Sequence, residues 1–376
     1  MTTPTSQAPE QAPARILNFS AGPAILPEEV LIEARDNLLS LGNLGMGILE
    51  ISHRAKEFEA ILSEAEQNLR QLMGLAPEQK VLFLHGGATL QFSMVPMNLL
   101  PPGRTADYVV TGEWSKKAVG EALRVGSVHV AASSEGEQFR RIPRSDELHF
   151  STSPAYVHTT SNNTIWGTQW QTEPETAGAP LVCDMSSDFL SRPIDAKRYS
   201  LIYAGAQKNA GPAGVTIVIV REDALKLDKA AQAKLPVLLN YRTHIEHKSL
   251  YHTPPVFSIY LVHLVLRWLK KSGGLSAMAA HNQQKAALVY GAIDAAPDFY
   301  RGHAEPGSRS LMNLTFRLPS DELTDKFVKQ AKAHGMDGLK GYRTVGGIRA
   351  SMYNAFPLAG ARVLSDFMAD FARKNG

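Results

Sequence analysis

Short apolar runs alternate with helical patterns between about residues 80 and 220. The candidate strands are residues 81–84, 108–111, 128–132, 156–160, 181–184, 201–204 and 215–220. Several of these runs are apolar throughout, which is typical of strands whose two faces are both covered by helices. The alternation therefore predicts an α/β fold built on a mostly parallel, doubly wound sheet of seven strands.

Helical spacing flanks this region on both sides. Residues 27–41 and 56–73 precede the sheet, and residues 258–271 form a long helical pattern that ends at Ser272-Gly273-Gly274. The glycine pair fits a helix C-cap and a hinge between domains. The elements expected beyond it are strands at 313–316 and 347–351 and helices at 321–334 and 359–373. They indicate a smaller α+β domain.

These elements predict a two-domain chain. We expect a large domain over residues 28–271 and a small domain formed by residues 16–27 and 272–376. Residues 1–15 are rich in Thr, Pro, Gln and Ala, with neither an apolar core nor a basic start. They predict a disordered tail rather than a signal peptide.

Charge and cysteine content exclude several classes of protein. The 39 basic and 36 acidic residues give a net charge of +3, which predicts neither a nucleic-acid nor a membrane partner. No segment approaches the roughly 20 apolar residues of a membrane span. The single cysteine, Cys183, excludes an intrachain disulfide and fits a reducing compartment, so we expect a cytoplasmic protein. We also expect no metal site.

The candidate chemistry lies at the ends of two predicted strands. Ligands of doubly wound sheets bind beyond the carboxyl ends of the strands. Asp184 ends the run 181–184, and Lys208 follows the run 201–204 at a Gly/Pro turn. A lysine whose pKa can be lowered suits Schiff-base formation, and a nearby carboxylate keeps a pyridine nitrogen protonated. The pair therefore predicts pyridoxal phosphate as the cofactor.

Three weaker signals accompany this pair. Gly86-Gly87 opens a helix after a strand and could present N–H groups to a phosphate, although a plain turn has the same composition. Trp114 could stack on a flat heterocycle or simply pack in the core. Thr164 could hydrogen-bond a phenolate or belong to an ordinary turn.

Cationic residues supply candidate anion sites. Arg349 lies inside an apolar, strand-like run, where a buried guanidinium needs an anionic partner such as a substrate carboxylate. His53-Arg54 and Arg343 could bind a second anionic group. The loop 251–255 could reach a phosphate across a dimer interface.

Several motifs together resemble the phosphoserine aminotransferase family. They are Asn18-Phe19-Ser20-Ala21-Gly22-Pro23, Glu50-Ile51-Ser52-His53-Arg54, His85-Gly86-Gly87, the run 204–208, Thr253-Pro254-Pro255 and Gly346-Gly347-Ile348-Arg349-Ala350-Ser351. The resemblance extends from about residue 16 to the C-terminus. It implies a fold-type I, class V pyridoxal-phosphate enzyme that is a homodimer with active sites at the subunit interface.

The resemblance also implies a reaction. Members interconvert O-phospho-L-serine and 2-oxoglutarate with 3-phosphooxypyruvate and L-glutamate in L-serine biosynthesis. In some bacteria they also serve pyridoxal-phosphate biosynthesis through a phosphorylated hydroxythreonine.

Site roles follow from the same resemblance, residue by residue. Lys208 is the Schiff-base lysine, Asp184 the partner of the pyridine nitrogen, Trp114 the stacking ring and Thr164 the partner of the phenolic oxygen. The cofactor phosphate is held by Gly87, Ala88, Thr89 and Gln207, and by His252 and Thr253 of the other subunit. The substrate is held by Arg349 at its α-carboxylate and by His53, Arg54 and Arg343 at its phosphate or at the distal carboxylate of glutamate. Tyr342 is a further substrate-binding residue.

Three departures from the relatives concern four positions: many relatives have Gly-Arg in place of Ala88-Thr89, and they often have His in place of Tyr342 and Asn in place of His252. These departures concern individual contacts rather than the class of reaction. The alternatives within the fold are a serine–glyoxylate aminotransferase and a cysteine desulfurase, for which Cys183 is poorly placed. A nucleotide-binding or interaction protein is the non-enzymatic alternative, although the chain lacks a G-x-G-x-x-G or Walker-type motif at a strand end.

Overall fold

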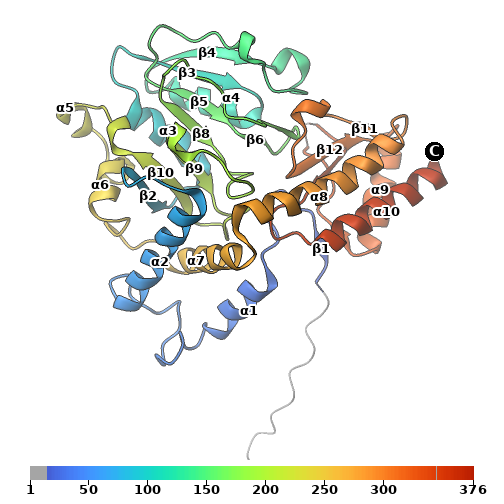
Figure 1. The fold of residues 1–376 in the computed structure, drawn as a ribbon, viewed down its shortest axis with the longest axis horizontal. Coiled ribbons are helices and arrows are strands. Elements are labelled where there is room, and N and C mark those ends of the chain that lie inside the picture. The colour runs from blue at the N-terminus through green and yellow to red at the C-terminus, as the bar shows by residue number, and fades with distance from the viewer. Residues whose placement is uncertain (1–14, 344) are drawn as a thin grey trace, which may run out of the picture.

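The computed structural model describes residues 15–343 and 345–376. The expected tail at residues 1–15 lies outside the described residues except for Arg15. Figure 1 shows a larger part built around a sheet, and a smaller part that carries the C-terminus. No helix within the described ranges is both long enough and apolar enough to cross a membrane.

All seven predicted strands form one sheet, in the order β2-β10-β9-β8-β5-β3-β4. Their bounds are β2 Gln79–Leu84, β3 Thr105–Val110, β4 Ser127–Ser133, β5 Val157–Thr160, β8 Leu181–Asp184, β9 Tyr199–Gly205 and β10 Thr216–Arg221. Strand β10 is antiparallel to both of its neighbours, whereas β9, β8, β5, β3 and β4 pair in parallel. The mostly parallel α/β sheet is therefore confirmed.

Helices cover both faces of this sheet, which explains why its strands read as apolar throughout. The helices of the larger part are α1 Glu28–Asp36, α2 Lys56–Met73, α3 Gly87–Leu99, α4 Glu113–Ala122, α5 Lys229–Gln232, α6 Tyr241–Glu246 and α7 Val256–Lys271. Alternate strand residues face opposite sides: Val81 and Phe83 pack with α2 and α7, whereas Leu82 and Leu84 pack with α3 and α4. Burial on both faces holds the strand ends in place.

Helix α1 ends five residues before the predicted limit at residue 41, and the reason is local. The Asn37 side chain accepts a hydrogen bond from Gly42 N at 2.8 Å, and its own amide donates to Glu33 O. Gly42 and Gly45 adopt positive φ angles of 56° and 68°. The side chain of Asn37 and these glycines turn the chain out of the helix.

The smaller part has its own sheet and core. Its elements are β11 Arg301–Gly302, β12 Asn313–Arg317, β14 Ile348–Ser351, α8 Gly274–Ala295, α9 Asp321–Ala333 and α10 Leu358–Asn375, and β1 Leu17–Asn18 pairs with β13 Met336–Asp337. Phe19, Phe316 and Phe327 lie in its core.

Two further short strands, β6 Asn162–Asn163 and β7 Thr168–Gln169, form a hairpin beside the large sheet. Short 3-10 helices lie at Glu135–Glu137, Ser145–Glu147, Ala196–Arg198, Glu222–Ala224, Val237–Leu239 and Pro306–Ser308.

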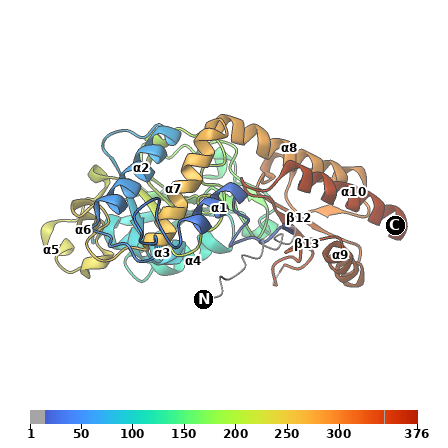
Figure 2. The same cartoon turned by 90° about the horizontal axis from the view of Figure 1, so that it is seen from below.

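Helix α8 connects the two parts and was not expected from the sequence. It begins at Gly274, directly after Gly273, whose φ of 94° lets the chain turn between α7 and α8. Leu275 and Met278 pack into the large core, whereas Val289 and Ile293 pack into the small one. Figure 2 shows α8 continuing beside α10 to the far end of the molecule. Because one helix serves both cores, the domain limits at 271 and 272 stay a prediction.

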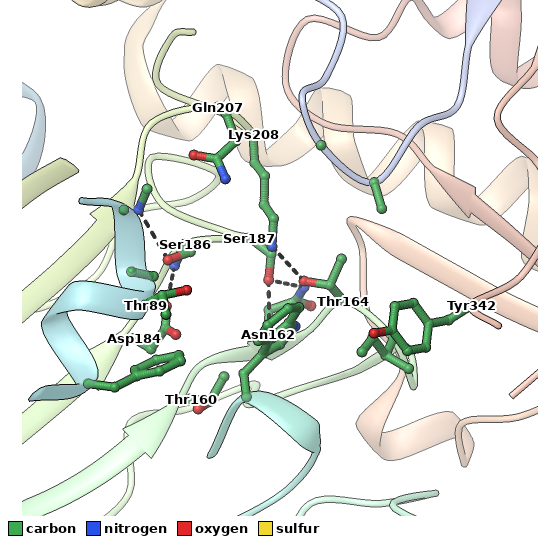
Figure 3. Close-up of a pocket in the computed structure, with 18 of the residues that line it drawn as sticks. Thr89, Thr160, Asn162, Thr164, Asp184, Ser186, Ser187, Gln207, Lys208 and Tyr342 are labelled. Atoms are coloured by element: carbon green, nitrogen blue, oxygen red, sulfur yellow. Dashed lines mark hydrogen bonds between the residues drawn. The ribbon is translucent and has the colours of Figure 1, made fainter. Parts of the chain in front are cut away.

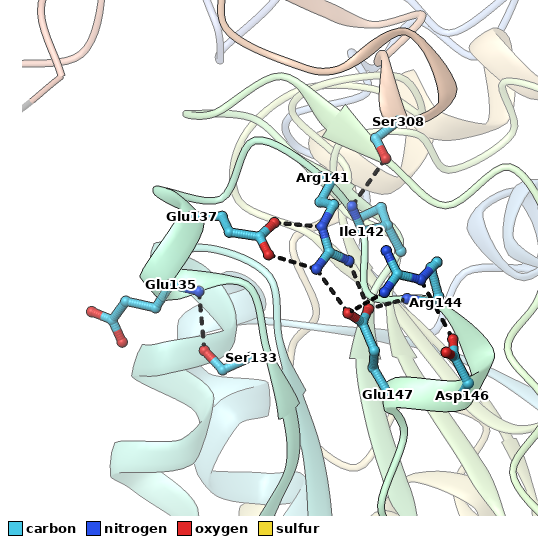
Figure 4. A network of polar contacts seen from close by, with 9 residues as sticks. All are labelled: Ser133, Glu135, Glu137, Arg141, Ile142, Arg144, Asp146, Glu147 and Ser308. Atoms are coloured by element: carbon cyan, nitrogen blue, oxygen red, sulfur yellow. Dashed lines mark hydrogen bonds and ion pairs between the residues drawn. The ribbon is translucent and has the colours of Figure 1, made fainter.

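A cluster of ion pairs lies within the segment after β4, which is hydrogen-bonded to the smaller part (Figure 4). Arg141 pairs with Glu137 and Glu147, and the contact with Arg141 lowers the pKa of Glu147 to about 2. Ile142 N donates to Ser308 Oγ at 3.0 Å. The charged cluster therefore shapes a segment that is hydrogen-bonded to the smaller part.

A buried lysine links α8 to the segment that follows β14. Lys285 is 0% exposed, and its Nζ donates to the carbonyl oxygens of Met352 and Tyr353 at 3.2 and 2.6 Å. Burial lowers the pKa of Lys285 to about 7. The folded protein thus holds this amine with fewer protons than the unfolded chain does at mildly alkaline pH.

We expect Lys285→Met to remove a pH dependence of stability. The unfolded lysine titrates near 10.4, so between pH 7 and about 10 the unfolded state binds more protons at this site, and the free energy of unfolding rises with pH. The contribution reaches at most about 1.4 kcal/mol per pH unit. Urea unfolding from pH 7 to 9.5 measures it, with the exposed Lys329→Met as the matched control. Equal pH slopes in the wild type and the Lys285 variant would contradict this account.

Candidate active site

A cavity of about 310 Å³ lies at the carboxyl ends of β5, β8 and β9 (Figure 3). The N-terminus of α3 borders it from the large part, and Arg349 on β14 reaches it from the small part. The expected residues that line it are Gly87, Ala88, Thr89, Trp114, Thr164, Asp184, Gln207, Lys208, Tyr342 and Arg349. The structure therefore brings most of the expected site into one space.

Lys208 enters the cavity from the turn that follows β9. Its Nζ donates a hydrogen bond to Thr164 Oγ1 at 2.8 Å. A Cβ on Gly22, where φ is 137°, would lie 3.3 Å from Lys208 Cγ, so a glycine leaves room for the lysine stem. Burial lowers the pKa of Lys208 to about 8, with Asp184 opposing this shift and Arg349 adding to it. A substantial share of the amine is therefore neutral near physiological pH.

Asp184 ends β8 and is 4% exposed. Its Oδ1 accepts a hydrogen bond from Ser186 N at 2.8 Å. Burial raises the pKa of Asp184, whereas the hydrogen bonds from Ser186 and the charge of Lys208 lower it. The ionised form of this carboxylate is therefore stabilised by its hydrogen-bond donors and by nearby positive charge. A cationic group on a ligand would stabilise it in the same way.

The N-terminus of α3 forms the candidate phosphate site. Gly86 and Gly87 have φ angles of 94° and 65°, and Gly87, Ala88 and Thr89 line the cavity. The first N–H groups of a helix have no acceptor within the helix and favour an anion. The side chain of Gln207 borders the same cavity. These groups fit the phosphate of the expected cofactor.

Unpartnered polar atoms surround the cavity. Among the described residues, Trp114 Nε1, Thr160 Oγ1 and Arg349 Nε are buried without a hydrogen-bond partner, and all three residues line this space. Such atoms are uncommon in folded proteins. Their convergence indicates a polar ligand, and the Trp114 ring, 6.0 Å from Lys208 Nζ, supplies a flat surface for a heterocycle. The residues present therefore fit pyridoxal phosphate.

Arg349 carries the positive charge on the opposite wall. Its nearest hydrogen-bond acceptor is Thr164 O at 3.5 Å, and its guanidinium lies 6.0 Å from the Tyr342 ring. Burial lowers the pKa of Arg349, and no salt bridge to it occurs within residues 15–343 and 345–376. A buried guanidinium without a protein carboxylate suits a substrate carboxylate.

Five expected residues lie outside the lining of this cavity: His53, Arg54, His252, Thr253 and Arg343. Arg54 and Arg343 are exposed. The ring of His252 lies against His85, with ring nitrogens 3.0 Å apart. Their assigned contacts with cofactor or substrate stay predictions, as does the contribution of His252 and Thr253 to the other subunit.

Sequence reasoning missed several lining residues. Thr160, Ser186 and Ser187 lie at or directly after the ends of β5 and β8. The strand-end rule that singled out Asp184 could have found them. Ala21 and Gly22 come from the distant N-terminal segment, which the sequence marks as a family motif but does not place at the cavity. Across the part of the chain that the structure describes, no group of three His, Cys, Asp or Glu residues is arranged to hold a metal.

Comparison with known proteins shows which family the chain belongs to. Residues 16–360 match the family model described as aminotransferase class-V. The chain is 53% identical to a phosphoserine aminotransferase of Herpetosiphon aurantiacus, an alignment that covers 96% of this chain and 99% of the relative.

The chain belongs to the class-V aminotransferase family.

Solved structures place this class-V chain in the same fold. It is 48% identical to the phosphoserine aminotransferase of Bacillus circulans subsp. alkalophilus, with a TM-score of 0.92 over 96% of this chain and 99% of that chain. The pyridoxal-phosphate-bound phosphoserine aminotransferase of Trichomonas vaginalis is 37% identical, with a TM-score of 0.89 over 94% and 99%. The resemblance expected from the motifs and the fold-type I architecture are therefore confirmed.

The lowered pKa of Lys208 generates a prediction about the apoprotein. We expect its capture of pyridoxal phosphate to speed up with pH around a midpoint near 8, because the neutral amine is the nucleophile. Asp184→Asn removes the charge that raises this pKa, so the midpoint moves lower. Stopped-flow absorbance measures the rate, and Lys208→Ala is the control that shows no saturable capture. A midpoint near 10.4 in the wild type would contradict the effect of burial.

Proposed function

We propose that this protein transfers the amino group of O-phospho-L-serine to 2-oxoglutarate, reversibly, with pyridoxal phosphate as its cofactor. The products are 3-phosphooxypyruvate and L-glutamate, and the reaction serves L-serine biosynthesis. The observation that carries the proposal is the placement of Lys208 and Asp184 in one cavity with the N-terminus of α3. Relatives about half identical over nearly the whole chain support the choice of substrate.

Each group of residues in the cavity has a separate role in the proposed transamination. Bound pyridoxal phosphate supplies a carbonyl that captures amines and a ring that accepts the electrons left at the substrate α-carbon. Asp184 would hold the ring nitrogen protonated, and Thr164 and Trp114 would fix the ring in position. The first-turn N–H groups at Gly87, Ala88 and Thr89 would bind the cofactor phosphate.

Proton transfer falls to Lys208. Burial lowers the pKa of its amine to about 8, so the neutral form is accessible near neutral pH, and in that form the amine can accept the α-proton of the substrate and later give a proton back. Arg349 would bind the α-carboxylate and so present the α-hydrogen to this amine. His53, Arg54, Tyr342 and Arg343 are proposed for the substrate phosphate or the distal carboxylate of glutamate.

The arrangement disfavours a cysteine desulfurase, which needs a mobile and reactive thiol. Cys183 is 2% exposed within β8, and burial raises the pKa of its thiol. A single, buried cysteine also fits a reducing compartment, and we propose the cytoplasm as the location. Recovery of the protein in a membrane or periplasmic fraction would contradict this.

Substrate preference tests the proposal. We expect kcat/KM for phosphoserine to exceed that for serine by at least about 100-fold, since the lost phosphate contacts are charge-assisted hydrogen bonds. Steady-state kinetics of the purified protein measure both values, and its visible absorption reports bound cofactor. Equal values for the two substrates, or a better one for serine, would favour a serine–glyoxylate aminotransferase.

The matched variant for this experiment is Arg349→Ala. It should raise KM for both phosphoserine and glutamate, because both carry the α-carboxylate that the guanidinium binds. The ratio between phosphoserine and serine should stay within about two-fold of the wild type, since the variant leaves the phosphate contacts in place. An unchanged KM would remove Arg349 from this role.

We also propose that the protein is a homodimer whose sites lie near the subunit interface. The loop between α1 and α2 exposes large apolar side chains, with Leu39 89% and Leu49 64% exposed, and it leads into His53 and Arg54. Exposed apolar groups gathered in this way are typical of an interface. Sedimentation equilibrium should give twice the 41.0 kDa chain mass, and Leu39→Asp should shift the equilibrium toward monomer. A wild-type monomer at micromolar concentration would contradict the proposal.

A further inference from the structure

Thr160 is an unexplained polar residue of the active-site wall. It ends β5, is 2% exposed and lines the cavity, and its Oγ1 is buried without a hydrogen-bond partner among the described residues. Neither the motifs nor the roles assigned above use it. A buried hydroxyl without a partner destabilises the protein that holds it, so a threonine here calls for a reason.

The register of the sheet supplies a partner. Thr160 on β5 lies directly beside Asp184 on β8 in a parallel pair, so the two side chains leave the same face of the sheet as neighbours. Figure 3 shows both on the side of the cavity away from the backbone of Lys208. Rotation about a single side-chain torsion moves the hydroxyl between neighbouring staggered positions.

Asp184 has capacity for another donor. Its Oδ1 accepts the hydrogen bond from Ser186 N, whereas a carboxylate offers about four lone-pair sites. Lys208 now contributes an attractive charge to this carboxylate. In the proposed function Lys208 becomes joined to the cofactor, and a nearby hydroxyl donor could then help to hold the carboxylate in its ionised form.

We propose that Thr160 is a further positioning residue of the cofactor site, whose hydroxyl donates a hydrogen bond to the Asp184 carboxylate when pyridoxal phosphate is bound. The proposal rests on the cofactor named in the proposed function. Thr160 acts through Asp184, which it would hold against the ring nitrogen. It transfers no proton and touches no substrate.

The chain contains a matched control for this inference. Thr216, the first residue of β10, is 0% exposed and its Oγ1 also lacks a hydrogen-bond partner in the described structure, but it does not line the cavity. Valine has the shape of threonine without the hydroxyl. Thr160→Val and Thr216→Val therefore remove the same group from the cavity wall and from the closed core.

The experiment compares apoprotein stability with cofactor affinity. Both valine variants should melt at or above the temperature of the wild-type apoprotein, because each loses an unpartnered hydroxyl. Titration with pyridoxal phosphate, followed by absorbance, should show a dissociation constant about ten-fold higher for Thr160→Val, which corresponds to one hydrogen bond to a charged group. Thr216→Val should bind as the wild type does, and Thr160→Ser should restore binding to within about three-fold.

Two results would overturn the inference. One is an unchanged dissociation constant for pyridoxal phosphate in Thr160→Val. The other is a Thr160→Ser variant that binds pyridoxal phosphate as weakly as Thr160→Val does, because a variant that keeps the hydroxyl would then bind no better than one that lacks it. If Thr160→Val does not fold, Thr160→Ala against Thr160→Ser repeats the comparison. A wild-type protein that fails to bind pyridoxal phosphate would refute the proposed function itself, whereas normal wild-type binding with a silent valine variant refutes only the role of Thr160.

Discussion

Burial of opposite charges in one cavity is the constraint on which the site depends. The interior disfavours the charged forms of both Lys208 and Asp184, and each group partly offsets that effect on the other. The result is an amine that is readily deprotonated and a carboxylate whose charge relies on its partners. Both properties suit the binding of pyridoxal phosphate, because the neutral amine can react with its carbonyl group and the carboxylate can pair with its protonated ring nitrogen.

The fold holds these two groups in place through its sheet. Asp184 ends β8 and Lys208 follows β9, a neighbouring parallel strand, and nearly all residues of both strands are buried. The Nζ of Lys208 is held by Thr164, which follows the short strand β6. The packing of helices on both faces of the sheet therefore helps to fix the positions of the reactive groups.

A buried hydrogen-bonded network ties the smaller part to this geometry. Asn162 Nδ2 donates to Asn313 Oδ1 at 2.8 Å, Asn313 Nδ2 donates to Tyr353 OH at 3.1 Å, and Tyr353 OH donates to Ala21 O at 2.8 Å. Asn162 and Ala21 both line the cavity. Since buried polar groups are costly unless they are paired, this network favours one arrangement of the two parts. That arrangement sets the position of Arg349 opposite Lys208.

The sequence by itself determined the strands of the sheet, the strand-end positions of Asp184 and Lys208 and the family, because periodicity and local motifs are properties of short segments. It did not predict α8, because alanines are spread around this helix and the polar Asn282 and Lys285 lie on its buried stripe, so the contrast between an apolar and a polar face is weak. Only the tertiary structure decided that Gly22 packs on the lysine stem, that Thr160 faces the cavity and that His53, Arg54 and Arg343 lie outside it. These facts depend on contacts between segments that are distant in the chain, and no local pattern encodes such contacts.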